Sequence, residues 1–377
     1  MHKKLFLGLA VVTLAVILTG CGLQNISQRQ TAKEPIEVGY SGALTGPLAG
    51  LGKNSRQGTE LAVEEINASG GINGRKVEID YQDDKYEVVE TLNNYNKFKF
   101  DNVDAILTNS YAGNLAIAQN ADADKMVIIN NIDTSDELAA AGDYTFAVGI
   151  YDEGIGFRLA EFLANKLQEK ETVIIYNQDD PFIKLVKDAF VSKYSELGGK
   201  TKNELGYAAN TGDFRAQLAK VKVLDLKSWV IVGFDEEGLL MKQAREMGIK
   251  AKFLGIDTFS SEEVKKSSKG TVDGSYFTFW DSSSDKVKAF KEKYKSKFGE
   301  EPDQILFAVT GYDSMMMLAQ AMRQAQQPRG ESLKNALYGI SDYEGLAGKL
   351  QMSPDGVVRS ILESIYQVKG DEFIKVE

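Results

Sequence analysis

The chain has 377 residues, which is enough for two domains that each bury a hydrophobic core, and its formal net charge at pH 7 is −10. An acidic surface repels phosphate backbones, so this charge argues against nucleic acid as a partner. The sequence holds a single histidine, His2, and a single cysteine, Cys21. The chain after Cys21 holds no histidine and no cysteine, so it cannot build a serine-histidine triad, a cysteine-histidine dyad or a histidine-based metal site. We expect no cofactor and no metal site.

The N-terminus has the three-part layout of a secretory signal peptide. Residues 1–4 carry two lysines, residues 5–18 are almost entirely apolar, and small residues follow up to Cys21. An uncleaved membrane helix needs about 20 apolar residues, more than this run supplies. We therefore expect residues 1–20 to be a signal peptide that directs the protein out of the cytoplasm.

The end of this segment, Leu18-Thr19-Gly20-Cys21, resembles the bacterial lipobox. The resemblance implies that the peptide is cut before Cys21 and that the thiol of this cysteine carries a lipid. The stretch that follows is polar and is typical of a flexible linker. We therefore expect residues 21–34 to be a lipidated tether that anchors the protein to the outside of the bacterial cell membrane.

The folded part is expected to begin at Pro35 with one strand-helix-strand unit. Apolar residues recur with a period of two in residues 36–40 and again in residues 77–81, which is typical of strands. Between them, residues 55–67 carry apolar side chains on one helical face, and the glycine-rich residues 69–74 end the helix.

The same alternation of strand and helix continues as far as Trp280. We predict strands at 105–108, 126–129, 172–176, 229–233 and 253–255, and helices at 151–166, 182–197 and 237–247. This order indicates an α/β fold with doubly wound parallel sheets rather than a barrel or a sandwich. Beyond Trp280 we predict helices at 286–298 and 306–325, then strands at 346–352, 360–368 and 372–376.

Three blocks of sequence look familiar in their order and spacing. Residues 38–47 read Val-Gly-Tyr-Ser-Gly-Ala-Leu-Thr-Gly-Pro, residues 56–58 read Arg-Gln-Gly, and residues 62–74 read Ala-Val-Glu-Glu-Ile-Asn-Ala-Ser-Gly-Gly-Ile-Asn-Gly. Together they resemble the branched-chain amino-acid (Leu/Ile/Val) binding family, the type I periplasmic solute-binding proteins of ABC transporters. Shorter matches follow at 83–84, 134–138, 151–154, 311–313 and 355–356. The resemblance covers nearly the whole chain after residue 35.

The resemblance implies two doubly wound parallel-sheet lobes joined by three hinge crossings, with a ligand held in the cleft between them. By analogy, lobe 1 holds residues 35–150 and 281–341, and lobe 2 holds residues 151–280 and 342–377. It also implies a monomer without enzymatic activity, which binds an amino acid or a related small polar ligand and delivers it to an ABC permease.

Ligands of open parallel sheets bind beyond the carboxyl ends of the strands, and two residues there match family positions for the charged ends of an amino acid. Asp257 matches the acid that holds the ligand ammonium; the alternative is that it caps the helix expected after it. Thr134 matches the threonine that holds the α-carboxylate; with Glu137 it also spells a helix capping box.

Other loops at the same edge supply further candidate contacts. Ser110 and Tyr111 occupy the loop that in relatives gives a hydroxyl to the ligand carboxylate. Phe182 lies where relatives often have tyrosine, Phe234 lies in the aromatic loop of the second lobe, and Leu51 faces the expected side-chain end of the pocket. Packing in the core is the alternative for the two phenylalanines.

Asp133 departs from the family pattern, because branched-chain amino-acid binders tend to carry small residues immediately before the threonine. A carboxylate beside a bound carboxylate is repulsive unless it turns outward or meets a positive group of the ligand. Asp133 therefore argues against a plain aliphatic amino acid and leaves open a polar, basic or amide-like ligand, or one that is not an amino acid at all.

Two other functions stay open at this point. An extracytoplasmic sensor would share the fold and present its ligand to a signalling receptor. A carboxylate-dependent hydrolase could use a pair among the 54 Asp and Glu residues. Nucleotide binding is disfavoured, because Gly52-Lys53 is followed by Asn54 where a phosphate-binding loop needs Ser or Thr.

Overall fold

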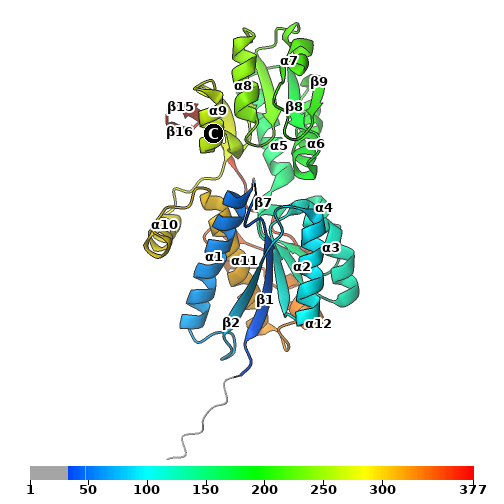
Figure 1. Ribbon diagram of the computed structural model, residues 1–377, viewed down its shortest axis with the longest axis vertical. Helices are drawn as coiled ribbons and strands as arrows, with labels where there is room; N and C mark the ends of the chain where they lie inside the picture. Colours follow the sequence, from blue (N-terminus) through cyan, green and yellow to red (C-terminus); the bar gives the residue numbers. More distant parts are fainter. Residues whose placement is uncertain (1–32, 47) are drawn as a thin grey trace, which may run out of the picture. The chain divides into compact units, whose positions relative to one another are not determined.

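The computed structural model describes residues 33–46 and 48–377. The expected signal peptide, Cys21 and most of the expected tether lie outside the described residues, so the predictions made for them stay predictions. From Glu34 to Glu377 the chain forms one compact unit. Two main sheets and the helices packed on them make up this unit (Figure 1).

The first sheet has five parallel strands in the order β2-β1-β3-β4-β6. The strands are β1 (Ile36–Gly42), β2 (Val77–Asp83), β3 (Ala105–Thr108), β4 (Ile128–Asn130) and β6 (Thr145–Ala147). Because β1 pairs with both β2 and β3, the chain changes direction across the sheet beside the carboxyl end of β1. In doubly wound sheets this switch point is where ligands bind.

Helices cover both faces of the first sheet. The helices α1 (Ala49–Ala68) and α11 (Ile305–Gln324) lie on one face, and α2 (Val88–Asp101) and α3 (Tyr111–Asp124) lie on the other (Figure 1). The first pair packs closely because a Cβ at Gly58 would come within 1.9 Å of the Ala308 carbonyl oxygen, and one at Gly311 within 2.2 Å of the Ser55 carbonyl oxygen. Only glycine allows this approach of the two backbones.

The second sheet has seven strands in the order β16-β15-β12-β11-β10-β8-β9. Five are parallel: β8 (Glu171–Asn177), β9 (Lys200–Tyr207), β10 (Ser228–Val232), β11 (Lys252–Gly255) and β12 (Tyr276–Phe279). The hairpin of β15 (Ser364–Lys369) and β16 (Glu372–Lys375) adds to β12 in the antiparallel sense. The predicted fold class, two doubly wound parallel-sheet lobes, is confirmed.

Alternate side chains of the central strands explain why helices cover both faces of this sheet. Val173 and Ile175 of β8 belong to one core cluster with Leu218 of α7 (Arg215–Lys222) and residues of α8 (Glu237–Glu246). Ile174, between them, belongs to the other large cluster with residues of α5 (Asp152–Glu161) and α6 (Pro181–Glu196). Because successive side chains of a strand point to opposite faces of the sheet, one strand contributes to two separate core clusters.

The remaining elements are short strands, two turns of other helix types and four further α-helices. They are β5 (Asp133–Thr134), α4 (Asp136–Ala139), β7 (Ile150–Tyr151), a π-helical turn (Phe162–Lys166), a 3-10 turn η2 (Asp257–Ser260), α9 (Glu262–Ser268), α10 (Asp285–Phe298), α12 (Gly330–Tyr338), β13 (Tyr343–Glu344) and β14 (Lys349–Leu350).

The last change of sheet comes later in the chain than the predicted boundary at residue 341. The backbone N–H of Ala147 donates to the Gly356 carbonyl, and that of Val358 donates to the Ala147 carbonyl. Residues up to Val358 therefore run beside β6 of the first sheet, and the second sheet resumes only at Ser364. The predicted strand at 346–352 contains only β14, which pairs with β13.

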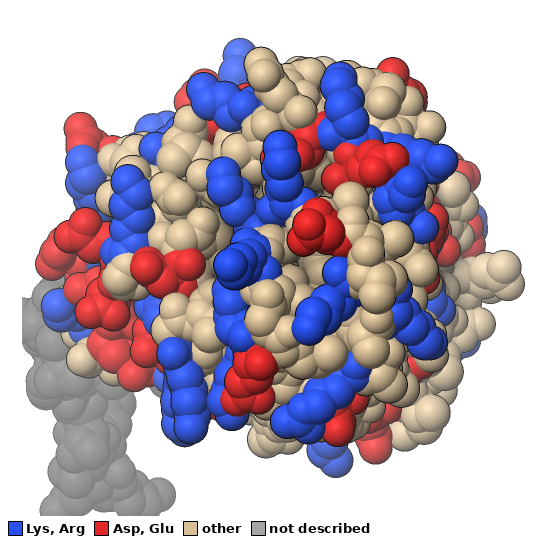
Figure 2. Space-filling model, turned by 90° about the horizontal axis from the view of Figure 1, so that it is seen from above, with Lys and Arg blue, Asp and Glu red and all other residues tan. Residues whose placement is uncertain are grey.

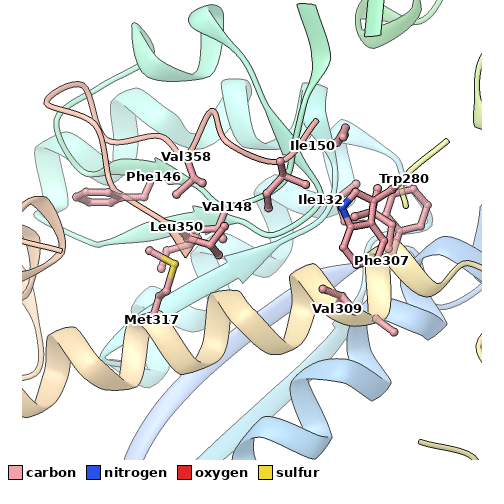
Figure 3. Packing of buried hydrophobic residues seen from close by; sticks show 14 of the residues in the cluster. Ile132, Phe146, Val148, Ile150, Trp280, Phe307, Val309, Met317, Leu350 and Val358 are labelled. Atoms are coloured by element: carbon pink, nitrogen blue, oxygen red, sulfur yellow. The ribbon is translucent and has the colours of Figure 1, made fainter. Parts of the chain in front are cut away.

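The largest core cluster gathers around α11. Figure 3 shows Val309 and Met317 of this helix in one cluster with Phe146 of β6 and with Leu350 and Val358 of the C-terminal segment. By length and composition α11 could cross a membrane, but 89% of its most apolar window is buried inside the protein. It is therefore explained as the central core helix.

Candidate functional site

A cavity of about 650 Å³ lies where loops from both main sheets meet. Its walls come from the start of α1, the loop after β2, the segment after β4, the start of α6, the loops after β10 and β11, the start of α11, and the residue before β15. The lining residues are Leu48, Gly50, Leu51, Tyr86, Ile132, Asp133, Ile150, Ile155, Phe182, Phe234, Asp235, Ile256, Asp257, Thr258, Ser260, Ser261, Glu262, Glu263, Asp303, Gln304, Leu306, Phe307 and Glu363. Most of these follow the carboxyl ends of parallel strands, which is where sheets of this kind bind ligands.

The structure brings five of the eight predicted ligand contacts together in this cavity. They are Leu51, Asp133, Phe182, Phe234 and Asp257. Ser110, Tyr111 and Thr134 do not line it. The two predicted phenylalanines, Phe182 and Phe234, are both partly buried; they pack against the largest core cluster and also line the cavity.

The three predicted residues outside the cavity use their polar atoms within the protein. Ser110 is the N-cap of α3 and its Oγ accepts from the Gly113 N–H at 3.1 Å. The buried hydroxyl of Tyr111 donates to Oε2 of Glu137 at 2.8 Å. Oγ1 of Thr134 accepts from the Gly149 N–H at 3.0 Å. Tyr111 thus uses its hydroxyl hydrogen within the protein, whereas the hydroxyls of Ser110 and Thr134 act as acceptors.

The helix after Thr134 is capped by the next residue. Ser135 is the N-cap of α4, and its Oγ accepts from the Leu138 N–H at 2.9 Å. The predicted capping box of Thr134 and Glu137 is therefore wrong by one residue. Thr134 instead belongs to the short strand β5, which pairs with β7 in the parallel sense.

Asp257 stands at the start of η2, directly beyond the carboxyl end of β11. It does not cap α9, because the N-cap of that helix is Ser261, whose Oγ accepts from the Val264 N–H at 3.1 Å. Burial raises the pKa of Asp257 to about 6, although its own backbone N–H and that of Thr258 favour the ionised form. A partly buried carboxylate that lines a cavity is suited to bind a cation.

Glu363 is a second acidic wall residue, and the sequence analysis missed it. Its side chain is 6% exposed, and Oε2 has no hydrogen-bond partner in the part of the chain that the structure describes. Burial, and then the charge of Asp257, raise its pKa well above the usual value. The alternation of the predicted strand 360–368 could have revealed it, because Glu363 falls on the same side of that strand as the buried Ile361 and Ile365.

Asp133 is a third acidic residue of the cavity wall. It is 6% exposed, and its Oδ2 accepts a long hydrogen bond of 3.4 Å from the Asn130 amide. Burial, and then the charge of Asp180, raise its pKa to about 7. Asp180 is itself the N-cap of α6, where it accepts from the Ile183 N–H at 3.1 Å.

Tyr86 reaches the same region and was also missed. Burial raises its pKa well above the usual value, and the charges of Asp180 and Asp133 add to this. Its backbone is left-handed, with φ of 64°, and its N–H donates to Oδ1 of Asp84 at 2.9 Å. Oδ2 of Asp84 accepts from the Ser41 hydroxyl at 2.9 Å. The acid pair at 83–84, noted in the sequence, therefore holds the turn that presents Tyr86.

The cavity is acidic and apolar at once. Seven of its lining residues are acidic, and no described lining residue is Lys, Arg or His. Among residues 33–46 and 48–377, no cluster of His, Cys, Asp or Glu is arranged to hold a metal ion. Aliphatic side chains and phenylalanines make up most of the rest of the wall: Leu48, Leu51, Ile132, Ile150, Ile155, Phe182, Phe234, Ile256, Leu306 and Phe307.

Comparison with known proteins agrees with this geometry. A family model described as periplasmic binding protein matches residues 35–367. Leu/Ile/Val-binding protein homolog 1 of Brucella abortus is 28% identical, and the alignment covers 94% of this chain and 93% of the relative. The predicted family resemblance is confirmed.

Solved structures give the same result. The branched-chain amino acid transporter substrate binding protein LivJ of Streptococcus pneumoniae, in complex with isoleucine, is similar with a TM-score of 0.79 and 28% identity, covering 90% of this chain and 97% of that chain. The leucine binding protein LivK of Thermotoga maritima is similar with a TM-score of 0.82 and 24% identity, covering 91% and 98%.

Proposed function

Because this chain belongs to the periplasmic binding protein family, we propose that it is the extracytoplasmic solute-binding component of an ABC importer that captures an amino acid or a related small polar ligand. The observation that supports this most is the cavity of about 650 Å³ lined from both main sheets. A volume of this size suits a small ligand and lies within the usual range for such sites. LivJ of Streptococcus pneumoniae, a structural relative, was solved with isoleucine.

The two lobes contribute different parts of the proposed site. Asp133 and Tyr86 come from segments that follow β4 and β2 of the first sheet, whereas Asp257 and Phe234 follow β11 and β10 of the second. Because neither set surrounds the ligand alone, binding favours the arrangement in which both sets contact it. The membrane permease would then recognise the protein with its lobes closed on the ligand.

Asp257 is the proposed partner of the ligand ammonium. It is a partly buried carboxylate, and the described residues that line the cavity include no basic side chain to neutralise it. A bound ammonium would supply the missing positive charge and favour the ionised form. This role is the same in an amino acid and in a simpler amine.

The protein is proposed to act at the outer surface of the cell membrane, to which a lipid on Cys21 would anchor it. The protein has no enzymatic role in this proposal and passes its ligand on unchanged. The test is titration calorimetry of the purified protein with single amino acids and amines, followed by mass spectrometry of the recovered ligand. Saturable binding with unaltered ligand supports the proposal, and a chemically changed product contradicts it.

A further inference from the structure

The polar groups that line the cavity are suited to cations and not to anions. The acidic wall residues are Asp133, Asp235, Asp257, Glu262, Glu263, Asp303 and Glu363, and no described residue of the wall is basic. A zwitterionic amino acid brings one carboxylate for each ammonium. In this cavity that carboxylate would be buried among like charges, which opposes binding unless a cation lies close by.

The hydroxyl groups of the wall do not change this conclusion, because three of them already donate to acceptors within the protein. Thr258 donates to Oε2 of Glu237, Ser261 to Oδ1 of Asp235 at 2.9 Å, and Ser260 to the Asp257 carbonyl at 2.6 Å. The hydroxyl of Tyr86 lies among carboxylates. The family positions that would hold the α-carboxylate, Thr134 and the loop of Ser110 and Tyr111, do not line the cavity.

A buried carboxylate oxygen without a partner points to a missing cation. Oε2 of Glu363 accepts no hydrogen bond of normal length within the described chain, and the Thr278 hydroxyl lies only close enough to lower its pKa; the residue is 6% exposed and lines the cavity. Burial favours the protonated form of such a carboxyl, and its ionised form needs a cation as partner. One ammonium at Asp257 and Glu363 would supply this partner.

Asp133 offers a second anionic centre on a different wall. It follows β4 of the first sheet, whereas Asp257 and Glu363 lie at the edge of the second. Isoleucine, leucine and phenylalanine side chains make up much of the wall. A ligand with cationic groups joined by an aliphatic chain matches this pattern, and the aromatic rings of Phe182 and Phe234 favour cations as well.

We propose that the ligand of this cavity is a small aliphatic amine of net positive charge, with one ammonium held by Asp257 and Glu363 and a second cationic group held by Asp133. The class includes diamines and basic amino acids. This inference rests on the proposed function, since it names the kind of ligand bound in that same cavity.

The test compares the affinities of cadaverine, L-lysine and L-leucine for the purified full-length protein by titration calorimetry at neutral pH. The inference predicts that cadaverine and L-lysine bind at least about tenfold more tightly than L-leucine, because both place a second ammonium near Asp133. Glu363→Gln should weaken cadaverine binding by at least about tenfold, and Asp133→Asn should do the same.

The control is Glu372→Gln, which removes the same charge from an exposed position on β16 and should leave cadaverine affinity unchanged. If L-leucine binds more tightly than both cations, and Glu363→Gln leaves its affinity unchanged, the inference is overturned while the proposed function stands. If a chain that is folded by circular dichroism binds neither the amines nor any amino acid, both are overturned.

Discussion

Glu363 and Asp257 lie far apart in the sequence, yet they line the same cavity, and the charge of Asp257 helps to raise the pKa of Glu363. The sheet explains their meeting. Strand β12 pairs with β11 in the parallel sense and with β15 in the antiparallel sense. The start of β15 therefore comes to the edge where β11 ends, so the residue before one strand lies near the residues after the other.

Replacing Asp257 tests the proposed ammonium site. Asp257→Ala should weaken the binding of an amino acid or amine by about 2 to 5 kcal/mol, because the ammonium would be buried without its counter-charge. Titration calorimetry measures this directly. Asp371→Asn, in the exposed turn between β15 and β16, removes an equal charge and serves as the control. An Asp257→Ala protein that keeps full affinity would exclude the role.

Replacing Gly58 tests the packing of α1 on α11. In Gly58→Ala the new Cβ would come within 1.9 Å of the Ala308 carbonyl oxygen, so the helices must move apart. We expect the free energy of unfolding to fall by about 1 to 3 kcal/mol or more, measured by urea denaturation.

The matched control for this packing test lies in the same helix. A Cβ at Gly50 meets no atom within 4 Å. Gly50→Ala should therefore leave stability unchanged or raise it by up to about 1 kcal/mol, through the better helix propensity of alanine. Equal effects of the two substitutions would contradict the close helix packing.

A strand could be predicted from the sequence where its apolar residues stand out from their surroundings, whether it lies inside a sheet or, like β2 and β16, at an edge. The predicted strand at 105–108 coincides with β3, whose residues are all buried. The edge strand β9 was not predicted because Lys200, Lys202 and Glu204 are exposed and only its last part is apolar. A polar edge strand carries no hydrophobic period for the sequence to display.

The candidate site could also be predicted only in part. The loops that follow parallel strands could be predicted, because their position depends only on the strand order. Which side chain faces the cavity depends on local hydrogen bonds. Tyr111 turns into the protein to donate to Glu137, whereas Tyr86 lies on a left-handed turn held by Asp84. No pattern of polarity in the sequence distinguishes these two tyrosines.

The lipid anchor is tested by Cys21→Ala. Without the thiol the lipid cannot be attached, so we expect this variant in the soluble fraction or as an unprocessed precursor. Fractionation of cells and immunoblotting separate these forms from the membrane-bound wild type. Serine at the same position is the conservative control and should behave like alanine. Membrane attachment of both variants at the wild-type level would rule out lipidation of Cys21.

The stability of the ligand-free protein should fall as the pH rises. Burial raises the pKa of Asp133 to about 7 and that of Asp257 to about 6, both above the value of 3.8 for a free aspartate. The folded state therefore holds these protons more tightly than the unfolded state. This contribution is fully present below about pH 4 and is lost as the pH rises through about 6 to 7.

Thermal unfolding of the ligand-free protein should show a higher midpoint at about pH 5 than at about pH 8. Asp281 and Asp355, whose pKa values fall to about 2, stay ionised throughout this window and do not contribute to the slope. Asp133→Asn should flatten the pH dependence and raise the midpoint at the alkaline end. A midpoint that rises with pH would contradict the burial of these acids.

Ligand affinity should have the opposite pH dependence. A cationic amine binds the ionised carboxylates, so its affinity should rise as the pH rises through about 6 to 7, and binding should release protons to the buffer. The groups that act on Asp133 are the acids Asp180, Asp257 and Asp152. Lys184 is the only cation among the main influences on the pKa of Asp180.

Calorimetry of cadaverine in two buffers of different ionisation enthalpy measures the proton release directly. The observed heat should differ between the buffers at about pH 6.5, and the difference should shrink in Asp133→Asn, because one of the titrating groups is gone. A neutral ligand would give the reverse result, since it binds beside protonated carboxyls and loses affinity as they ionise. The sign of the pH dependence therefore separates a cavity built for cations from one that accepts neutral molecules.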